Sequence, residues 1–129
     1  MSLADFTKQF FETALWSSTG DDDQPLDKKY KVTDFDPTCR KRLTEECAKF
    51  WDQVRDDVKL RWDDRTAGHD FWLTRCEHGA GFWDGDYEYK NGEDDGDYLT
   101  ELSKAFGNVD LYVGDDGKVY ASGKEDTWS

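Results

Sequence analysis

The 129-residue chain is poor in aliphatic side chains and in basic charge. It has no isoleucine, and Leu, Val and Phe together account for 23 residues, 18% of the chain. Asp and Glu outnumber Lys and Arg by 30 to 17, which gives a formal net charge of −13. Few aliphatic residues combined with high net charge are typical of disordered chains. A core made of aliphatic side chains alone is therefore excluded.

Other scarce features exclude whole classes of protein. No apolar run approaches the roughly 18–20 residues of a membrane helix, and no basic segment leads into an apolar one, so we expect neither a membrane span nor a cleaved signal. Three cysteines without a CxxC pair argue against a disulfide framework and favour reduced thiols in a cytosol. The excess of acids disfavours direct binding to nucleic acid, because it repels phosphate groups.

Aromatic side chains are what the chain has in quantity. Six Trp, six Tyr and eight Phe make up 16% of the residues, and each ring buries roughly 150–250 Å². The composition therefore predicts one folded acidic domain, residues 1–129, with a core built mainly from rings. We expect only the tail, 122–129, to be frayed.

Three segments have the periodicity of amphipathic helices. Residues 3–17 and 37–62 repeat apolar side chains every three or four positions. The second segment follows Asp36, a capping residue, and starts with proline, which suits the first helical position. A shorter pattern over 97–107 ends at Gly107.

Two further segments predict β-hairpins. Aromatic runs within 70–84 surround a turn that contains glycine, and 109–121 contains an Asp-Gly pair, which tolerates the positive φ angles of a tight turn. Two hairpins can combine into a small sheet whose apolar face is covered by helices. The expected fold is therefore α+β: an antiparallel sheet from hairpins at about 70–84 and 109–121, covered by two or three helices at about 3–17, 37–62 and 97–107.

Both histidines lie in the stretch 68–84. An imidazole oriented by a carboxylate can transfer protons, and an arginine can hold an anion. The candidate catalytic residues are His69, Arg75, His78 and Asp84. No nucleophile, glycine-rich phosphate loop or GxSxG motif accompanies them, so the sequence favours a protein that is not an enzyme. The alternative is that the same stretch is structural, with glycines in the turn and rings in the core.

A zinc site is the main metal alternative. His69, Cys76 and His78, with Cys39 or Asp84, would supply four ligands of the right kind. Their H-x6-C-x-H spacing matches no common structural zinc pattern. We therefore expect no dedicated metal site and no cofactor.

The acidic charge is concentrated in the second half of the chain. Residues 84–97 hold seven acids against one lysine. Their start is similar to a calcium loop, but the glycine at position six and the glutamate at position twelve are missing. The stretch is either a solvated loop or a face that docks on a basic protein surface, with DNA mimicry as one version. The residues predicted to contribute to such a binding surface are Trp72, Trp83, Asp84, Asp86, Glu88, Asp94, Asp95, Asp115 and Asp116.

Three motifs carry a resemblance to known proteins. HDFWLTR at 69–75, HGAGFWD at 78–84 and DLYVGDDGKVY at 110–120 resemble a group of small proteins encoded by bacteriophages and prophages. The resemblance spans about residues 68–121, roughly two fifths of the chain. It implies phage ancestry and a place in the cytoplasm of the infected cell, and it implies no particular activity.

Charge and resemblance together predict a phage-derived accessory protein that binds a host or phage protein with a basic surface. An anti-defence role is one form of this hypothesis. One alternative is a small enzyme or ligand-binding domain that uses His69, Arg75, His78 and Asp84. Another is a component of the virion or of its assembly.

Overall fold

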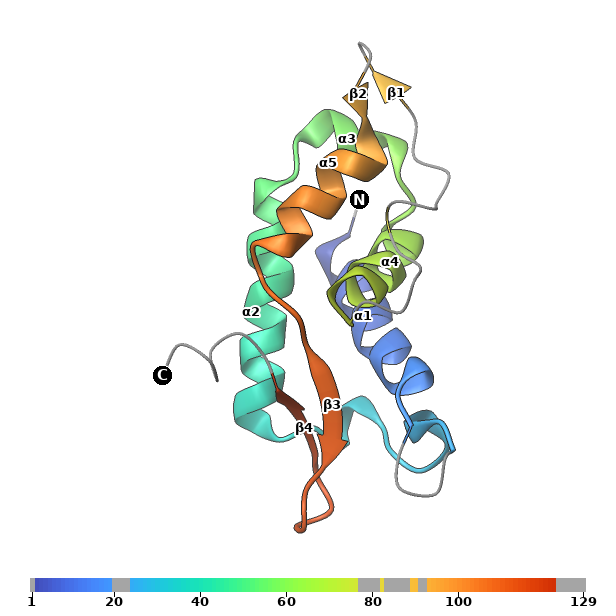
Figure 1. Ribbon diagram of the computed structural model, residues 1–129, viewed down its shortest axis with the longest axis vertical. Helices are drawn as coiled ribbons and strands as arrows, with labels where there is room; N and C mark the ends of the chain where they lie inside the picture. The colour runs from blue at the N-terminus through green and yellow to red at the C-terminus, as the bar shows by residue number, and fades with distance from the viewer. Residues whose placement is uncertain (1, 20–23, 77–81, 83–88, 91–92, 123–129) are drawn as a thin grey trace.

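The computed structural model describes residues 2–19, 24–76, 82, 89–90 and 93–122 (Figure 1). Five α-helices make up most of this described part, and short 3-10 turns, η1 and η2, join the first two. The helices are α1 (Leu3–Ser17), α2 (Pro37–Gln53), α3 (Asp56–Arg61), α4 (Asp64–Cys76) and α5 (Asp95–Lys104). The remaining elements are η1 (Leu26–Lys28), η2 (Val32–Asp34), β1 (Tyr89–Lys90), β2 (Glu93–Asp94), β3 (Asp110–Val113) and β4 (Val119–Ser122).

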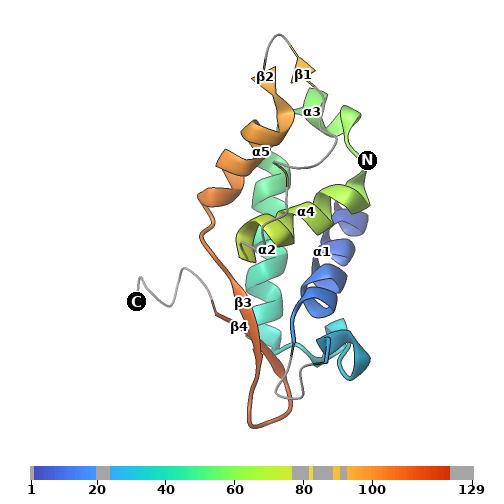
Figure 2. The same cartoon turned by 45° about the vertical axis from the view of Figure 1, so that its right-hand side comes forward.

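The expected α+β fold is wrong, because the sheet it required does not form. The strands in the described part of the chain make two separate antiparallel pairs, β1–β2 and β3–β4. The pair at β3–β4 confirms the hairpin expected at 109–121, and Gly117 in its turn has φ +79°. These two pairs lie at opposite ends of the molecule, with the helices between them (Figures 1 and 2).

The hairpin expected at 70–84 is wrong where the structure describes it, because residues 64–76 form helix α4. Asp63 begins this helix: its carboxylate accepts hydrogen bonds from the backbone N–H of Thr66 (2.9 Å) and from its hydroxyl (2.8 Å). These bonds lower the pKa of Asp63. The aromatic run at 71–73 does not alternate with polar residues, and a continuous apolar run fits a buried helix as well as a strand. Residues 77–81 and 83–84 lie outside the described part.

The expected helix at 37–62 is two helices. Val54 is extended (φ −73°, ψ 131°) and separates α2 from α3. The break places Asp56 and Asp57 in the first turn of a new helix, where the helix dipole favours negative charge. The side chain of Tyr98 on α5 bridges the break: its hydroxyl accepts from the backbone N–H of Arg55 (3.2 Å) and donates to the carbonyl of Gln53 (3.3 Å).

The other helix boundaries follow the sequence more closely. Helix α1 has the expected bounds, 3–17, and Ser2 caps it through a hydrogen bond from the backbone N–H of Asp5 (3.1 Å). Helix α5 begins two residues before the expected 97 and ends at Lys104, and Gly107 follows it with φ +77°. The tail expected to fray, 122–129, lies outside the described residues except for Ser122 at the end of β4.

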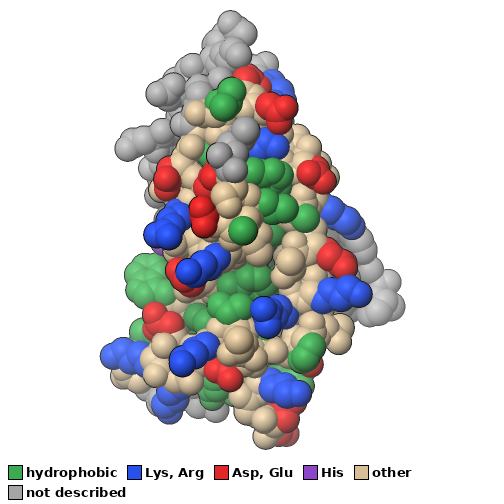
Figure 3. Space-filling view, turned by 180° about the vertical axis from the view of Figure 1, so that it is seen from behind, with side chains coloured by type: hydrophobic (Ala, Val, Ile, Leu, Met, Phe, Trp, Pro, Cys, Tyr) green, Lys and Arg blue, Asp and Glu red, His purple; other side chains and the backbone are tan. Residues whose placement is uncertain are grey.

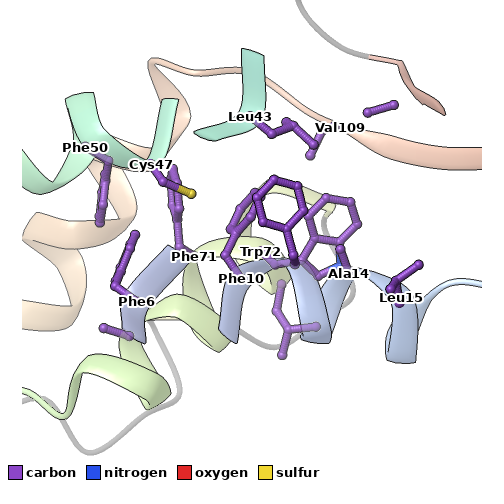
Figure 4. Close-up of a cluster of buried hydrophobic side chains, with 14 of the residues drawn as sticks. Phe6, Phe10, Ala14, Leu15, Leu43, Cys47, Phe50, Phe71, Trp72 and Val109 are labelled. Atoms are coloured by element: carbon purple, nitrogen blue, oxygen red, sulfur yellow. The ribbon is translucent and has the colours of Figure 1, made fainter. Parts of the chain in front are cut away.

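The core is a stack of aromatic rings between α1, α2 and α4 (Figure 4). The rings of Phe50 and Phe71 are closest, with centroids 4.1 Å apart and planes 14° apart. Phe6 stacks against both, at 5.9 Å and 5.8 Å. Six aromatic side chains in this cluster are fully buried: Phe6, Phe10, Phe50, Phe71, Trp72 and Phe82. The core therefore combines stacked rings with leucine, valine and alanine side chains.

Helices α1 and α4 pack closely against each other. Gly68 is the point of closest approach. A Cβ atom at this position would overlap the carbonyl oxygen of Phe6 and would lie 3.2 Å from the backbone nitrogen of Phe10. The absence of a side chain at Gly68 therefore sets the distance between the two helices.

Candidate functional site

Helix α4 carries the two candidate catalytic residues that the structure describes, and it directs them to different neighbours. Nδ1 of His69 lies 3.0 Å from Oγ1 of Thr13 on α1. Nη1 of Arg75 lies 2.5 Å from Oε1 of Glu46 on α2. Six residues correspond to about one and two-thirds helical turns, so the two side chains leave α4 on different sides. The structure does not bring His69 and Arg75 together.

Arg75 joins three parts of the core. Its side chain is 1% exposed, its Nε donates to the carbonyl of Gly107 (3.2 Å) and its Nη2 donates to the carbonyl of Phe106 (3.1 Å). The guanidinium also lies 5.5 Å from the ring centroid of Phe71. Burial lowers the pKa of Arg75, and the charge of Glu46 opposes that shift. These contacts make Arg75 a structural link between α4, α2 and the segment after α5.

His69 lines a hollow of about 310 Å³ on a different side of α4 from Arg75. We call it the Trp16 hollow, and its lining residues are Gln9, Glu12, Thr13, Trp16, Asp27 and His69. The indole of Trp16 is 57% exposed, and its ring centroid is 5.9 Å from that of His69. Helices α1 and α4 and the 3-10 turn η1 therefore all contribute to this hollow.

The Trp16 hollow is negatively charged. Glu12 and Asp27 are exposed, and neither has an ion-pair partner among the residues that the structure describes. Thr13 holds two polar side chains of the hollow in place. Its hydroxyl oxygen accepts a hydrogen bond from Nε2 of Gln9 (3.1 Å), and the same hydroxyl is hydrogen-bonded to Nδ1 of His69. An exposed ring, two carboxylates and an oriented imidazole thus border one depression.

The residues predicted for a binding surface do not form one exposed face in the described part of the chain. Trp72 is fully buried, and its Nε1 donates to Oγ of Ser17 (2.7 Å), so it belongs to the core. Asp95 is 2% exposed at the start of α5, so it does not contribute to an open face. Asp94 pairs with Tyr89 through the β1–β2 backbone. The other predicted residues of this region lie outside the described part: His78, Trp83, Asp84, Asp86 and Glu88.

Asp115 and Asp116 are exposed in the β3–β4 turn, as expected. The hydroxyl of Tyr120 donates to Oδ2 of Asp116 (2.6 Å). This bond raises the pKa of Tyr120 to about 12 and, together with a backbone bond from Lys118, lowers the pKa of Asp116. The ring of Tyr112 stacks on that of Tyr120 with centroids 5.5 Å apart. Acids and rings therefore share the tip of this hairpin.

A second depression, an apolar groove of about 600 Å³, lies between α1 and α2. We call it the α1–α2 groove, and it is lined by Leu3, Ala4, Thr7, Lys8, Phe11, Glu12, Val32, Arg40, Thr44 and Ala48. Hydrophobic side chains gather in the middle of this face, between charged ones (Figure 3). Sequence reasoning missed this groove. Its signal is the spacing of Leu3, Thr7 and Phe11 along α1, of which Phe11 also belongs to the core.

The described residues contain no group of three or more His, Cys, Asp or Glu side chains that could hold a metal ion. Of the ligands weighed for the zinc alternative, Cys39 has its sulfur 3.8 Å from the carbonyl oxygen of Ala121, and Cys76 has its sulfur 3.7 Å from that of Leu73. Within the same part of the chain, no helix has the length and apolar character needed to cross a membrane.

Comparison of the chain with protein-family models, with curated proteins and with solved structures found no match in any of the three.

Proposed function

We propose that this protein is a non-enzymatic binding module, derived from a phage, that docks on a basic protein surface through exposed acids and rings. The observation that carries the proposal is the Trp16 hollow, where a 57% exposed indole lies beside two carboxylates that have no ion-pair partner in the described part. Exposed tryptophans are enriched among the residues that dominate binding energy at protein interfaces.

Two further features support this proposal. The tip of the β3–β4 hairpin presents Asp115 and Asp116 near the 53% exposed ring of Tyr112. The net charge of −13 adds long-range attraction to a basic partner, which accelerates association and depends on salt. Against an enzyme, the contacts of Arg75 are with Glu46 and backbone carbonyls, so it has a structural role.

The test is capture of partners from a bacterial lysate by the immobilised protein at low salt, followed by affinity measurements with the purified partner. We expect a partner with a basic surface whose affinity falls as salt is added, because salt screens exposed charges. The absence of any partner at low salt, or an affinity that does not depend on salt, would contradict the proposal.

A further inference from the structure

We propose that the Trp16 hollow binds a single guanidinium group, the side chain of an arginine on the partner protein. This inference rests on the proposed function and names the chemical group that the site recognises. The hollow is about 310 Å³, which places it at the lower end of the usual range of ligand pockets. It is therefore suited to one side chain and is too small for a whole peptide.

The charges at the hollow select a cation. Glu12 and Asp27 contribute two negative charges at its rim. Trp16 lies in the last turn of α1, and this turn contains no basic residue. Because the carbonyl groups at a helix C-terminus carry partial negative charge, they attract cations and repel anions. An anionic ligand would meet repulsion from all three sources.

The exposed indole favours guanidinium over other cations. A cation over the face of tryptophan is attracted by its ring quadrupole. Guanidinium is planar, stacks on aromatic faces and can donate two parallel hydrogen bonds to a carboxylate, whereas an ammonium group is a compact and strongly hydrated charge. Trp16 supplies a face for stacking, and Glu12 and Asp27 supply the acceptors.

The imidazole of His69 also lines the hollow, and two neighbours fix its position. Its ring lies 5.9 Å from that of Trp16, tilted by 39°, and its Nδ1 is held by Thr13. The indole therefore has a ring of α4 as its neighbour, while Trp16 as a whole stays 57% exposed. A guanidinium stacked on the open face would remove that surface from water without any rearrangement of the core.

The direct experiment is a titration of the ¹⁵N-labelled protein with N-acetyl-arginine methylamide, followed through the indole N–H signals in NMR. We expect a saturable shift of the Trp16 signal and none of the buried Trp72 signal. N-acetyl-citrulline methylamide, which has nearly the same shape without the charge, should bind at least about tenfold more weakly, since it lacks both the charge pairs and the cation–π contact. Equal binding of the two compounds overturns the inference.

Matched variants separate this site from general attraction to an acidic protein. Glu12→Gln/Asp27→Asn and Glu45→Gln/Asp52→Asn each remove two exposed negative charges, but only the first pair lines the hollow. We expect the first to weaken binding of the arginine compound about tenfold and the second to change it less than twofold. Equal losses in the two variants would show that net charge alone is responsible, and the inference would fail.

Trp16→Leu separates this inference from the proposed function. Because Trp16 is exposed, the variant should keep the circular dichroism spectrum of the parent. We expect its affinity for a captured basic partner to fall at least about fivefold, since stacked cations are worth more than exposed charge pairs. An unchanged affinity overturns the inference while the proposed function stands. If the arginine compound binds saturably but no protein partner is captured, the hollow still recognises guanidinium and the proposed function falls.

Discussion

Gly68 determines how closely α1 and α4 can pack. We expect Gly68→Ala to destabilise the fold by about 1–3 kcal/mol, the usual cost of forcing an extra carbon into a packed site, because the new Cβ would overlap the backbone of Phe6. Urea unfolding measures the loss. Gly117→Ala is the control: its strained φ of +79° also carries a cost, but no atom lies within 4 Å of the added Cβ. Faster amide exchange in α1 and α4 should appear in Gly68→Ala alone.

Arg75 and Glu46 form a buried ion pair, and each depends on the other. We expect Arg75→Met to cost about 3 kcal/mol, because it leaves the largely buried carboxylate of Glu46 with only the longer contact to Nε of Arg42 (3.6 Å). The double variant Arg75→Met/Glu46→Leu should lose less than the sum of the two single variants, since it removes both charges. A double-mutant cycle by urea unfolding checks this. Additive losses would show that the 2.5 Å contact contributes no coupling.

At the scale of elements, the β3–β4 hairpin contains a hydrogen bond that responds to pH. The bond from Tyr120 to Asp116 raises the pKa of the phenol from its ordinary value of 10 to about 12. A raised pKa means that the neutral form is favoured in the folded state, so this stabilisation is complete below about pH 10 and disappears as pH rises through about 12. For Asp116 the pKa is lowered, so its contribution is lost as pH falls into the acidic range.

Asp116→Asn tests that bond. We expect the pKa of Tyr120 to return toward 10, because the carboxylate is the largest cause of the shift. The difference between the alkaline ultraviolet titrations of the variant and the parent reports one tyrosine out of six. Identical titration curves would show that the hydrogen bond is absent in solution. Asp115→Asn, which removes a neighbouring charge but no bond to Tyr120, serves as the control.

Tyr98 holds the break between α2 and α3. We expect Tyr98→Phe to destabilise the protein by about 0.5–1.5 kcal/mol, the typical worth of a hydrogen bond, because the backbone groups of Gln53 and Arg55 lose their partner hydroxyl. Amide exchange should accelerate mainly in α3. Tyr30→Phe removes a hydroxyl that has no hydrogen bond within the described part, and it should change stability by less than about 0.5 kcal/mol. Equal effects of the two substitutions would contradict this role of Tyr98.

The sequence allowed some elements to be predicted and not others. Helix α1 and the β3–β4 hairpin have local signals, a cap at Ser2 and an Asp-Gly turn, and both predictions are confirmed. Whether residues 64–76 form a helix or a strand depends on how the continuous apolar run at 71–73 packs, and periodicity does not distinguish the two for such a run. The capping pair Asp63 and Thr66 was the available evidence for a helix. Tyr98, 44 residues away, bridges the break at Val54. The local signal for the break was the pair Asp56 and Asp57, which the continuous apolar periodicity outweighed.

The candidate site was predictable only in part, for the same reason. His69 was singled out, and it does line a hollow. Its neighbours Glu12 and Trp16 come from α1, and Asp27 comes from η1, so only the packing of α1 against α4 brings them together. Arg75 was singled out as a holder of anions, but burial against Glu46 gives it a structural role. Residue type alone could not distinguish a buried ion pair from an anion site.

At the scale of the whole molecule, the aromatic core makes Cys47 a reporter of global unfolding. Cys47 is fully buried among the rings, and burial raises the pKa of its thiol. Both effects prevent alkylation, because the thiolate is the reactive form. We expect iodoacetamide to modify Cys47 only as urea unfolds the protein, in parallel with the change in tryptophan fluorescence. Mass spectrometry of peptides measures this for each cysteine.

The half-buried Cys39 and Cys76 provide the comparison within the same chain. Both should be alkylated in native buffer faster than Cys47, since their sulfur atoms are nearer to solvent. Modification of Cys47 in native buffer at the rate of Cys39 would mean that the ring stack opens without global unfolding, which the close packing of Phe50 and Phe71 argues against.

Glu12 borders both the Trp16 hollow and the α1–α2 groove. A molecule that draws this carboxylate to one side of α1 takes it away from the other side. Occupancy of the two depressions is then thermodynamically linked, and the factor by which the first ligand changes the affinity for the second must equal the factor in the reverse direction. If both depressions bind ligands, the one carboxylate of Glu12 would couple the two binding events.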